Sequence, residues 1–528
     1  MMRESASSSA PADAAEQRQA AAAARPPVND RREIFGWTMF DWANSAFSTT
    51  VATVFLGPYL TSIAEAATRN SGGFLYLGQV PIKFDSFFTF CVSASVLLEV
   101  TFLPVLGALA DYSHLRKQFL MLFSTLGALA TLLMFAIGPG QYLFGGALFI
   151  IANLAFGACI TFYNSYLPDI ASEDRRDHVS AAGFGLGYLG GGLLLVGNLI
   201  MYLLSDRLGL TSALVARISL ASAGAWWLGF SLITFRTLRP RHAVQHLPAG
   251  ETYFSIGFRQ LGELMGVPVR LVTSLMLLPL AIPILIFAGL PIGIALLPAA
   301  GPLAVLVIFI GRKARTEPEA MKFLVAYLLY NDGIQTVIVV SAIFAAEELH
   351  MSATMRILVI LMIQFVAFGG SYLFSYLARL MGTKRAILLS LFIWSGATIY
   401  AFFGMRSAEP VPGLGMTQQQ FEFWIMGALV AIVLGGSQAL SRSLFAQMIP
   451  RDQQAEYFSF YEISDRGTSW LGTFVFGLAN QLLGSLRLGI LSLIFFFLVG
   501  LVLLPFVNVP KAMQQARQAT PGVAGGTE

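Results

Sequence analysis

The sequence has few charged residues and almost no cysteine. Asp, Glu, Lys and Arg make up 12% of its 528 residues, whereas hydrophobic residues make up 56%. This composition leaves too little polar surface for a soluble globule of that length, so lipid must cover most of the molecule. The two cysteines, Cys91 and Cys159, are too few for a disulfide framework or for a tetrahedral metal site of their own. We expect both to be buried structural thiols.

Long stretches without any charge predict membrane spans, because roughly 20 apolar residues cross the hydrocarbon core of a bilayer. The uncharged stretches run over 119–168, 271–311, 357–378 and 488–510. The beginning of the chain is different. It is rich in Ala, Ser and Pro and lacks the apolar segment of a secretory signal, so we expect a disordered tail there.

The basic residues of the loops predict the orientation in the membrane. We place about 14 spans, including a closely spaced pair near 270–290 and 292–311. With a cytoplasmic N-terminus, 24 Lys and Arg fall in cytoplasmic segments and 7 in outer loops. Lys and Arg concentrate on the cytoplasmic side of membrane proteins. We therefore expect both termini in the cytoplasm and, as the location, the bacterial inner (plasma) membrane.

Two short patterns recur at corresponding spans. In the first span, Asp41 is followed three residues later by Asn44, and in a span of the second half Asp332 is followed by Gln335. The sequences NSYLP at 164–168 and AQMIP at 446–450 also end corresponding spans. The recurrence favours a duplicated six-helix unit, as many transporters have.

Five motifs, in this order, resemble the vacuole-effluxer-like branch of the major facilitator superfamily. They are WTMFDWANSAF at 37–47, NSYLPD at 164–169, GFGLGYLGGG at 183–192, AYLLYNDGIQ at 326–335 and GGSQALSRSLF at 435–445. That branch contains the fungal autophagy-related vacuolar amino acid exporters and bacterial relatives of unassigned substrate. The resemblance covers residues 33–510.

The resemblance implies an all-α membrane protein with two six-helix bundles of the major-facilitator type. Since the family has twelve spans, the apolar pair at 269–311 is interpreted as a two-helix insertion. A hairpin or interfacial segment that does not cross fully is the alternative, because five prolines interrupt it. The expected division is a disordered cytoplasmic tail (1–32), the N-terminal half (33–236), a cytoplasmic linker with the inserted pair (237–320), the C-terminal half (321–510) and a disordered tail (511–528).

The stretch GALAD at 107–111, followed by Arg116 and Lys117, is similar to the superfamily's loop between spans two and three. The resemblance implies a gating loop of Gly107, Asp111, Arg116 and Lys117, in which Asp111 contacts a helix end or a basic group of the other half. The second-half loop lacks the corresponding Asp and Gly. The gate contact is therefore predicted for the first half alone.

Polar residues inside spans are the candidates for function, because they are costly at that depth. Asp332 lies nearest the middle of a span, with Tyr330, Asn331 and Gln335 close by. Burial without a cationic partner favours the neutral form of a carboxyl group, so Asp332 is a candidate for substrate binding or for loading and releasing a proton. A hydrogen-bond network that packs helices is the alternative.

Other candidates for handling substrate or protons are Asp41, Asn44, Glu99, Tyr163, Asn164, Gln438 and Arg442. Arg442 is a cation placed deep in the second half, where a guanidinium can hold a carboxylate by two contacts. An ion pair with Asp332, or a side chain that reaches back to the interface, is the alternative for Arg442. Structural roles at a helix end or interface are the alternatives for the others.

The sequence has no Walker lysine, zinc-ligand spacing or nucleophile elbow, and the GLGYLG pattern at 185–190 has no preceding strand. We expect no enzyme activity, cofactor, metal or nucleic-acid partner. The predicted function is a monomeric secondary active transporter that moves a small polar solute by alternating access with proton coupling. The resemblance implies an amino acid as the solute of the eukaryotic members, whereas the bacterial branch implies no particular solute. A non-transporting receptor, scaffold or intramembrane enzyme is the alternative.

Overall fold

The computed structural model describes residues 28–519 with several gaps. The residues left out within this range are 70–71, 78–79, 85–86, 113–114, 241–251, 283–284, 286–296, 452, 464–471, 473–474 and 477–484. The described chain is mostly helical. It also contains an antiparallel hairpin of β1 (Phe74–Leu77) and β2 (Val80–Lys83), in which Phe74 lies opposite Lys83.

The first half contains six segments long and apolar enough to span a membrane. The first segment is continuous and consists of α2 (Arg31–Ala46), the π-helix η1 (Phe47–Phe55) and α3 (Leu56–Thr68). The others are α4 (Phe87–Tyr112), α5 (Arg116–Leu133) with η3 (Met134–Ala136), α6 (Tyr142–Ser165) with α7 (Leu167–Ile170), α8 (Arg176–Leu203) and α9 (Ser212–Thr237).

Side-chain and backbone contacts explain the local form of the first segment. The Asp30 carboxylate accepts hydrogen bonds from the amides of Arg32 and Glu33 and so begins α2. In the nine-residue η1, the Thr53 hydroxyl donates to the carbonyl of Ser48, five residues earlier, at 2.8 Å. This contact matches the wider turn of a π-helix, a form that is rare and often lies near functional sites.

Among its described residues, the second half contains five segments of this kind. Its elements are α15 (Pro318–Glu347), α16 (Ala353–Met381), α17 (Thr383–Phe403), α18 (Gln418–Met448), α19 (Gln454–Glu462), α21 (Leu486–Ser492), α22 (Ile494–Leu503) with η7 (Leu504–Phe506), and α23 (Val509–Ala519). The sequence also predicts a span at 465–484, which lies almost entirely outside the described residues. The helix α19 precedes this segment and is buried along its length.

The linker between the halves forms α10 (Tyr253–Met265), α11 (Val269–Leu277), η4 (Leu278–Ala281), η5 (Leu297–Ala299) and α14 (Ala300–Thr316). The chain bends by 113° between α10 and the segment that follows it. Among the described residues, eleven helices are long and apolar enough to span a membrane, or twelve if this bent pair counts as one. The predicted count of about 14 is therefore not confirmed, and most of the turn between the predicted pair lies outside the described residues.

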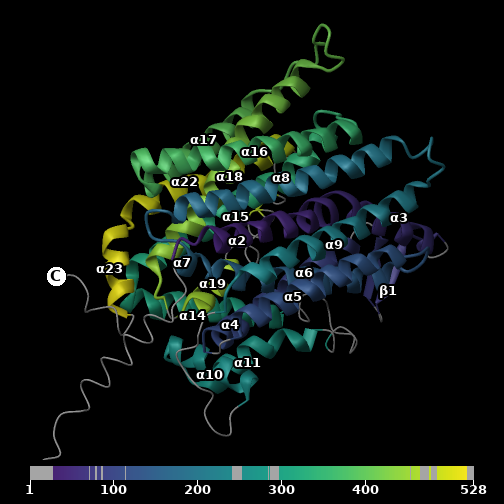
Figure 1. The fold of residues 1–528 in the computed structure, drawn as a ribbon. Coiled ribbons are helices and arrows are strands. Elements are labelled where there is room, and N and C mark those ends of the chain that lie inside the picture. The colour runs from purple at the N-terminus through teal and green to yellow at the C-terminus, as the bar shows by residue number, and fades with distance from the viewer. Residues whose placement is uncertain are drawn as a thin grey trace, which may run out of the picture.

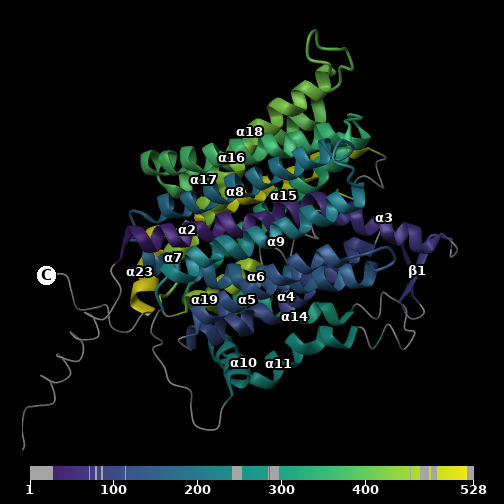
Figure 2. The same cartoon turned by 45° about the vertical axis from the view of Figure 1, so that its right-hand side comes forward.

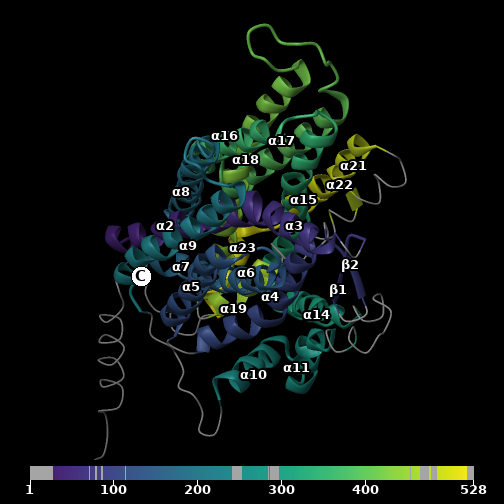
Figure 3. The ribbon, with the colours of Figure 1, turned by 90° about the vertical axis from the view of Figure 1, so that its right-hand side faces the viewer.

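Most of the long helices lie side by side along one direction in Figures 1 and 2. Figure 3 looks along the bundle and separates α16, α17 and α18 of the second half from α4, α5 and α6, with α10 and α11 at the outer edge. We call the end at which α4 finishes and α19 begins the Asp111 end. It lies on the left of Figure 1, where α23 is also found, and the β hairpin lies at the other end.

The predicted disordered tail at 511–528 is wrong for residues 511–519, which belong to α23. The side chain of Asn508 accepts a hydrogen bond from the amide of Lys511 at 3.1 Å and begins the helix. Ala512 and Ala516, one turn apart, are buried. A polar sequence with a narrow apolar stripe thus forms a helix that packs on the bundle.

Candidate functional site

Arg442 of α18 lies at the contact between the two halves and is 2% exposed. Its Nε and Nη2 donate to the hydroxyl and the carbonyl oxygen of Ser180 in α8, each at 2.9 Å. Nη1 and Nη2 both lie 3.4 Å from Oδ2 of Asp41 in α2, and Nη1 also donates to Oδ1 of Asn164 in α6 at 3.2 Å. Three helices of the first half therefore hold one cation of the second.

Aromatic rings enclose the Arg442 guanidinium. Its central carbon lies 4.1 Å from the ring centroid of Phe184, 4.9 Å from that of Trp37 and 5.5 Å from that of Tyr163. The hydroxyl of Tyr163 donates to Asp41 Oδ2 at 2.7 Å, and the Trp37 and Tyr163 rings stack at 4.3 Å. Ring faces attract cations, so these contacts add to the ion pair in stabilising a buried charge.

Gly183 gives this group the space it needs. A Cβ at this position would lie 2.5 Å from Asp41 Oδ2 and 3.0 Å from both Arg442 Nη2 and the Tyr163 hydroxyl. Gly187 and Gly191 repeat the close approach of α8 to α2. The four-residue spacing of these glycines suits close helix packing.

The polar contacts continue away from Arg442. Asn164 donates from Nδ2 to Glu462 of α19 at 2.8 Å, and the Ser180 hydroxyl donates to the carbonyl of Ala439 at 2.7 Å. We call the set Asp41, Tyr163, Asn164, Ser180, Arg442 and Glu462 the arginine network. Close by in sequence, Tyr188 donates to Gln438 at 2.6 Å, again between α8 and α18.

Asp332 lies on α15 and is fully buried. The alternative pairing with Arg442 is not seen, because Arg442 contacts Asp41. Within the described part of the chain no cation pairs with Asp332, and a Cβ on Gly472 would lie 3.1 Å from its Oδ2. Tyr330 forms a 2.6 Å hydrogen bond with Ser441 of α18. The neighbours Asn331 and Gln335 lie on the same helix, Asn331 buried and Gln335 half-buried.

The predicted gating residues lie at a crossing between α4 and α19. The Asp111 carboxylate accepts hydrogen bonds from the backbone amides of Ala455 and Glu456, at 3.0 and 2.7 Å, at the beginning of α19. Arg116 pairs with Asp111 and also with Asp169, the latter at 3.3 Å. A carboxylate at a helix N-terminus satisfies free amides there and complements the helix dipole.

Gly107 allows α4 and α19 to approach each other. A Cβ there would lie 2.5 Å from the carbonyl oxygen of Ala455 and 3.0 Å from the Glu456 Cα. These are backbone atoms, which cannot rotate away. Lys117 is half-buried in α5, and the described structure gives it no ion pair.

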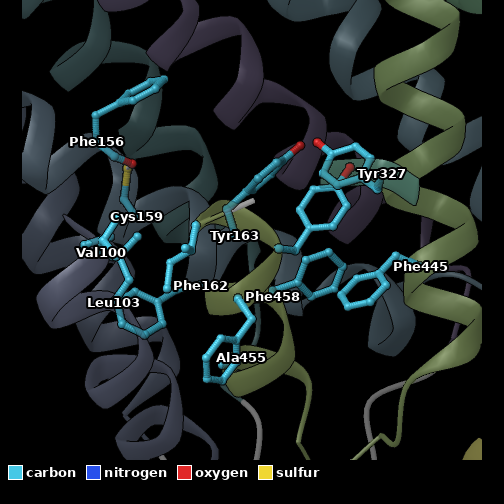
Figure 4. Packing of buried hydrophobic residues seen from close by; sticks show 14 of the residues in the cluster. Val100, Leu103, Phe156, Cys159, Phe162, Tyr163, Tyr327, Phe445, Ala455 and Phe458 are labelled. Atoms are coloured by element: carbon cyan, nitrogen blue, oxygen red, sulfur yellow. The ribbon is translucent and has the colours of Figure 1, made fainter. Parts of the chain in front are cut away.

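The remaining candidates, Glu99 and Asn44, do not contact Arg442 in the described structure. Glu99 of α4 accepts a 2.8 Å hydrogen bond from Asn153 of α6, which also donates to Ser95. Asn44 is buried on α2, one turn beyond Asp41. Figure 4 shows Phe162 of the first half with Phe445 and Phe458 of the second in the same apolar cluster, which also includes Tyr163. The interface around the arginine network is thus apolar outside its few polar contacts.

The sequence model of the family described as "vacuole effluxer Atg22 like" matches residues 29–279 and 304–517. The chain belongs to this family. The predicted branch is therefore confirmed. The unmatched residues 280–303 lie inside the predicted apolar insertion, and they begin within η4 and end in the first turn of α14.

Relatives and solved structures agree with this assignment. The uncharacterized MFS-type transporter YxiO of Bacillus subtilis strain 168 is 26% identical over 486 residues, which cover 91% of this chain and 96% of that protein. Autophagy-related protein 22 of Coccidioides immitis strain RS is 23% identical over 590 residues, covering 94% and 89%.

Among solved structures, the proton:xylose symporter XylE has a TM-score of 0.58 at 13% identity and covers 90% of this chain and 93% of its own. The human organic anion transporter MFSD10 has a TM-score of 0.56 at 14% identity, covering 91% and 100%. The Atg22-like chain therefore has the major-facilitator fold, as predicted. It is a multi-pass membrane transporter and not an enzyme.

The sequence motifs contained most residues of the arginine network, but they did not predict which of these residues contact one another. Asp41, Tyr163, Asn164 and Arg442 were all candidates, and the structure brings them together. Ser180 and Glu462 were missed. Glu462 has a usable signal, since it is an acid within the otherwise uncharged stretch 457–464 next to a predicted span. Among the described residues, no group of His, Cys, Asp and Glu suits a metal ion.

Proposed function

We propose that this Atg22-like protein is a secondary active transporter that moves a small polar solute, with amino acids as the favoured class, by alternating access coupled to protons. The observation that carries the proposal is the contact of Arg442 with Asp41. This contact joins an anion of one half to a cation of the other in an apolar interface. A major-facilitator transporter must open and close between these halves.

The chemistry of this pair supports a zwitterionic solute. Breaking the contact would leave one buried cation and one buried anion, a cost of about 3–5 kcal/mol if nothing replaced them. An amino acid offers a carboxylate for Arg442 and an ammonium group for Asp41, so it compensates both charges at once. Asn164 and Ser180 supply neutral hydrogen-bonding groups beside them.

Asp332 supports the proposed proton coupling. It is a carboxyl group buried on the first helix of the second half, with no cation paired to it in the described residues. Such a group can take up and release a proton when one side of the membrane gains access to it. Asp332 contacts neither Asp41 nor Arg442, so solute and proton would have different primary sites.

The proposed location is the bacterial inner (plasma) membrane, with both termini and the Asp111 end in the cytoplasm. The excess of Lys and Arg in the segments assigned to that side supports this orientation. The B. subtilis relative supports the bacterial membrane, while the fungal relatives carry the name of an autophagy-related protein. We propose a monomer that needs only the solute and protons as partners.

The test is flux into proteoliposomes with an imposed pH gradient and a panel of labelled amino acids. We expect gradient-dependent accumulation of at least one of them, loss of that flux in Arg442→Lys, and normal flux in Arg406→Lys, an exposed residue far from the site. Lysine keeps the charge but cannot reproduce the guanidinium contacts. Absence of flux for the whole panel, with an unchanged metabolite profile in a deletion strain, would favour the receptor or scaffold alternative.

A further inference from the structure

A second polar site lies at the Asp111 end, away from the arginine network. A cavity of about 80 Å³ is lined by Arg176 at the start of α8, Arg451 after α18 and Arg517 of α23. A water molecule has a share of roughly 30 Å³ in the liquid, so the cavity has room for a compact polyatomic group. Arg176 belongs to the first half, and Arg451 and Arg517 belong to the second.

The charge of this cavity is unbalanced. Among its described lining residues, Glu173 is a single carboxylate beside three guanidinium groups, and it pairs with Arg517 at 2.6 Å. The formal charge of the lining is therefore positive by two. Like charges brought together in a partly enclosed site repel each other strongly, because solvent screens them less than at an open surface.

Arg176 makes the imbalance significant, because its residue is only 3% exposed. Its guanidinium donates to the backbone carbonyls of Ala171, Pro168 and Ala446, at 3.2, 3.4 and 3.5 Å. In the part of the chain that the structure describes, no carboxylate pairs with it. A buried guanidinium held by long contacts to neutral carbonyls is poorly compensated, and the cavity lies directly against it.

We propose that this cavity is an anion site that binds a phosphate group. Planar guanidinium groups bind phosphate oxygens through paired hydrogen bonds, and three of them converge here from three separate segments. Gln447, which also lines the cavity, can donate a further hydrogen bond. A free inorganic phosphate and the phosphate of a lipid headgroup share this chemistry.

Occupation of the site has a structural consequence. The anion contacts Arg176 of one half and Arg451 and Arg517 of the other, so it joins the halves at the end where Asp111 also joins them. Binding therefore stabilises the arrangement in which this end is closed. The proposal does not depend on which solute is transported.

The experiment uses the full-length purified protein. Thermal unfolding is followed while phosphate replaces chloride at constant ionic strength, in detergent and in nanodiscs of pure phosphatidylcholine. In a second arm, native mass spectrometry measures retention of phosphatidylglycerol against phosphatidylcholine. The variants are Arg451→Gln with Arg517→Gln, and Arg385→Gln as the control, because Arg385 is an exposed arginine that does not line the cavity.

We expect phosphate or phosphatidylglycerol to stabilise the wild type and Arg385→Gln alike. The half-maximal phosphate concentration, or the retained fraction of lipid, should change by at least about tenfold in the double variant, since each lost charge-assisted contact contributes substantially. A response to free phosphate identifies a soluble anion, and a response to the lipid alone identifies a headgroup. Equal responses in the double variant and the control, or no response to either ligand, would overturn the proposal. Both substituted residues are exposed, so the variants should fold.

Discussion

Two acids at equivalent positions in the two halves have different surroundings. Asp41 lies on α2 and Asp332 on α15, each near the start of a half, and both are buried. Asp41 contacts Arg442 and the Tyr163 hydroxyl. Asp332 has no such cation in the described residues. The same sequence pattern therefore occurs in two different environments. The charge of Asp41 is balanced by a cation, and that of Asp332 is not balanced in the described residues.

The compensated pair predicts a thermodynamic coupling. Asp41→Asn leaves Arg442 buried without a carboxylate, and Arg442→Gln leaves Asp41 buried without a cation. Each single change should destabilise the protein by about 3–5 kcal/mol. The double change Asp41→Asn with Arg442→Gln should recover most of that loss, while remaining inactive in transport. Thermal unfolding and abundance of the purified variants measure this coupling. Additive losses in the double variant would rule out a direct ion pair.

The uncompensated acid predicts a different result. Asp332→Asn keeps the size of the side chain but removes its ability to titrate. We expect normal abundance, because no ion pair is broken, together with loss of accumulation driven by a pH gradient. Exchange of solute at equal pH should persist. Asp206→Asn, at an exposed position, is the control. Normal pH-driven accumulation by Asp332→Asn in proteoliposomes would exclude the coupling role.

At the scale of elements, the crossing of α4 and α19 determines how the Asp111 end closes. Gly107 permits the approach and Asp111 holds the first amides of α19. The two residues act differently, since one removes an obstacle and the other forms bonds. Variants of both residues should therefore shift the equilibrium between the closed and open forms of the Asp111 end, by different amounts.

Gly107→Ala should open the Asp111 end, because its Cβ would lie 2.5 Å from the carbonyl oxygen of Ala455. The readout is thiol labelling of Ser443→Cys, a buried position of α18, after replacement of both native cysteines. We expect faster labelling by at least about tenfold, the equivalent of a 1.4 kcal/mol shift. Gly197→Ala is the control, since nothing lies within 4 Å of a Cβ there. Equal labelling in the two variants would refute the steric role.

Asp111→Ala should shift the same labelling in the same direction. It removes two hydrogen bonds to the start of α19, and loss of a helix cap costs about 0.5–2 kcal/mol. Asp111→Asn can still accept one hydrogen bond, so its effect should be smaller. If both variants label at the wild-type rate, the cap does not contribute to closing this end.

The positions of most long helices could be predicted from the uncharged stretches, because membrane burial selects for them regardless of partner. The contacts between the two halves could not be predicted from the sequence. Sequence alone offered Asp332 as an ion-pair partner for Arg442, yet the packing of the two halves places Asp41 against it. The helix α23 was missed because few of its residues are apolar, with Ala512 and Ala516 buried in an otherwise polar tail.

For the whole molecule, the proposed orientation is tested by labelling single cysteines in intact cells. The variants Ser71→Cys and Ser407→Cys should react with a membrane-impermeant thiol reagent from outside. The variant Ser255→Cys, in α10, should react only after the membrane is opened. The prediction follows from the distribution of Lys and Arg in the loops. Labelling of Ser255 from outside would reverse the assignment of the Asp111 end.

The nine-residue π-helix η1 follows Asp41 and Asn44 in the first helical segment. A π turn accommodates one more residue than an α turn while leaving the flanking helices intact. We infer that one residue was inserted into an α-helix here. Alignments of Atg22-like proteins should therefore contain single-residue gaps between positions 47 and 55, with the residues on both sides kept in register. In this family, the first helical segment would then vary in length without changing the position of Asp41 relative to Arg442.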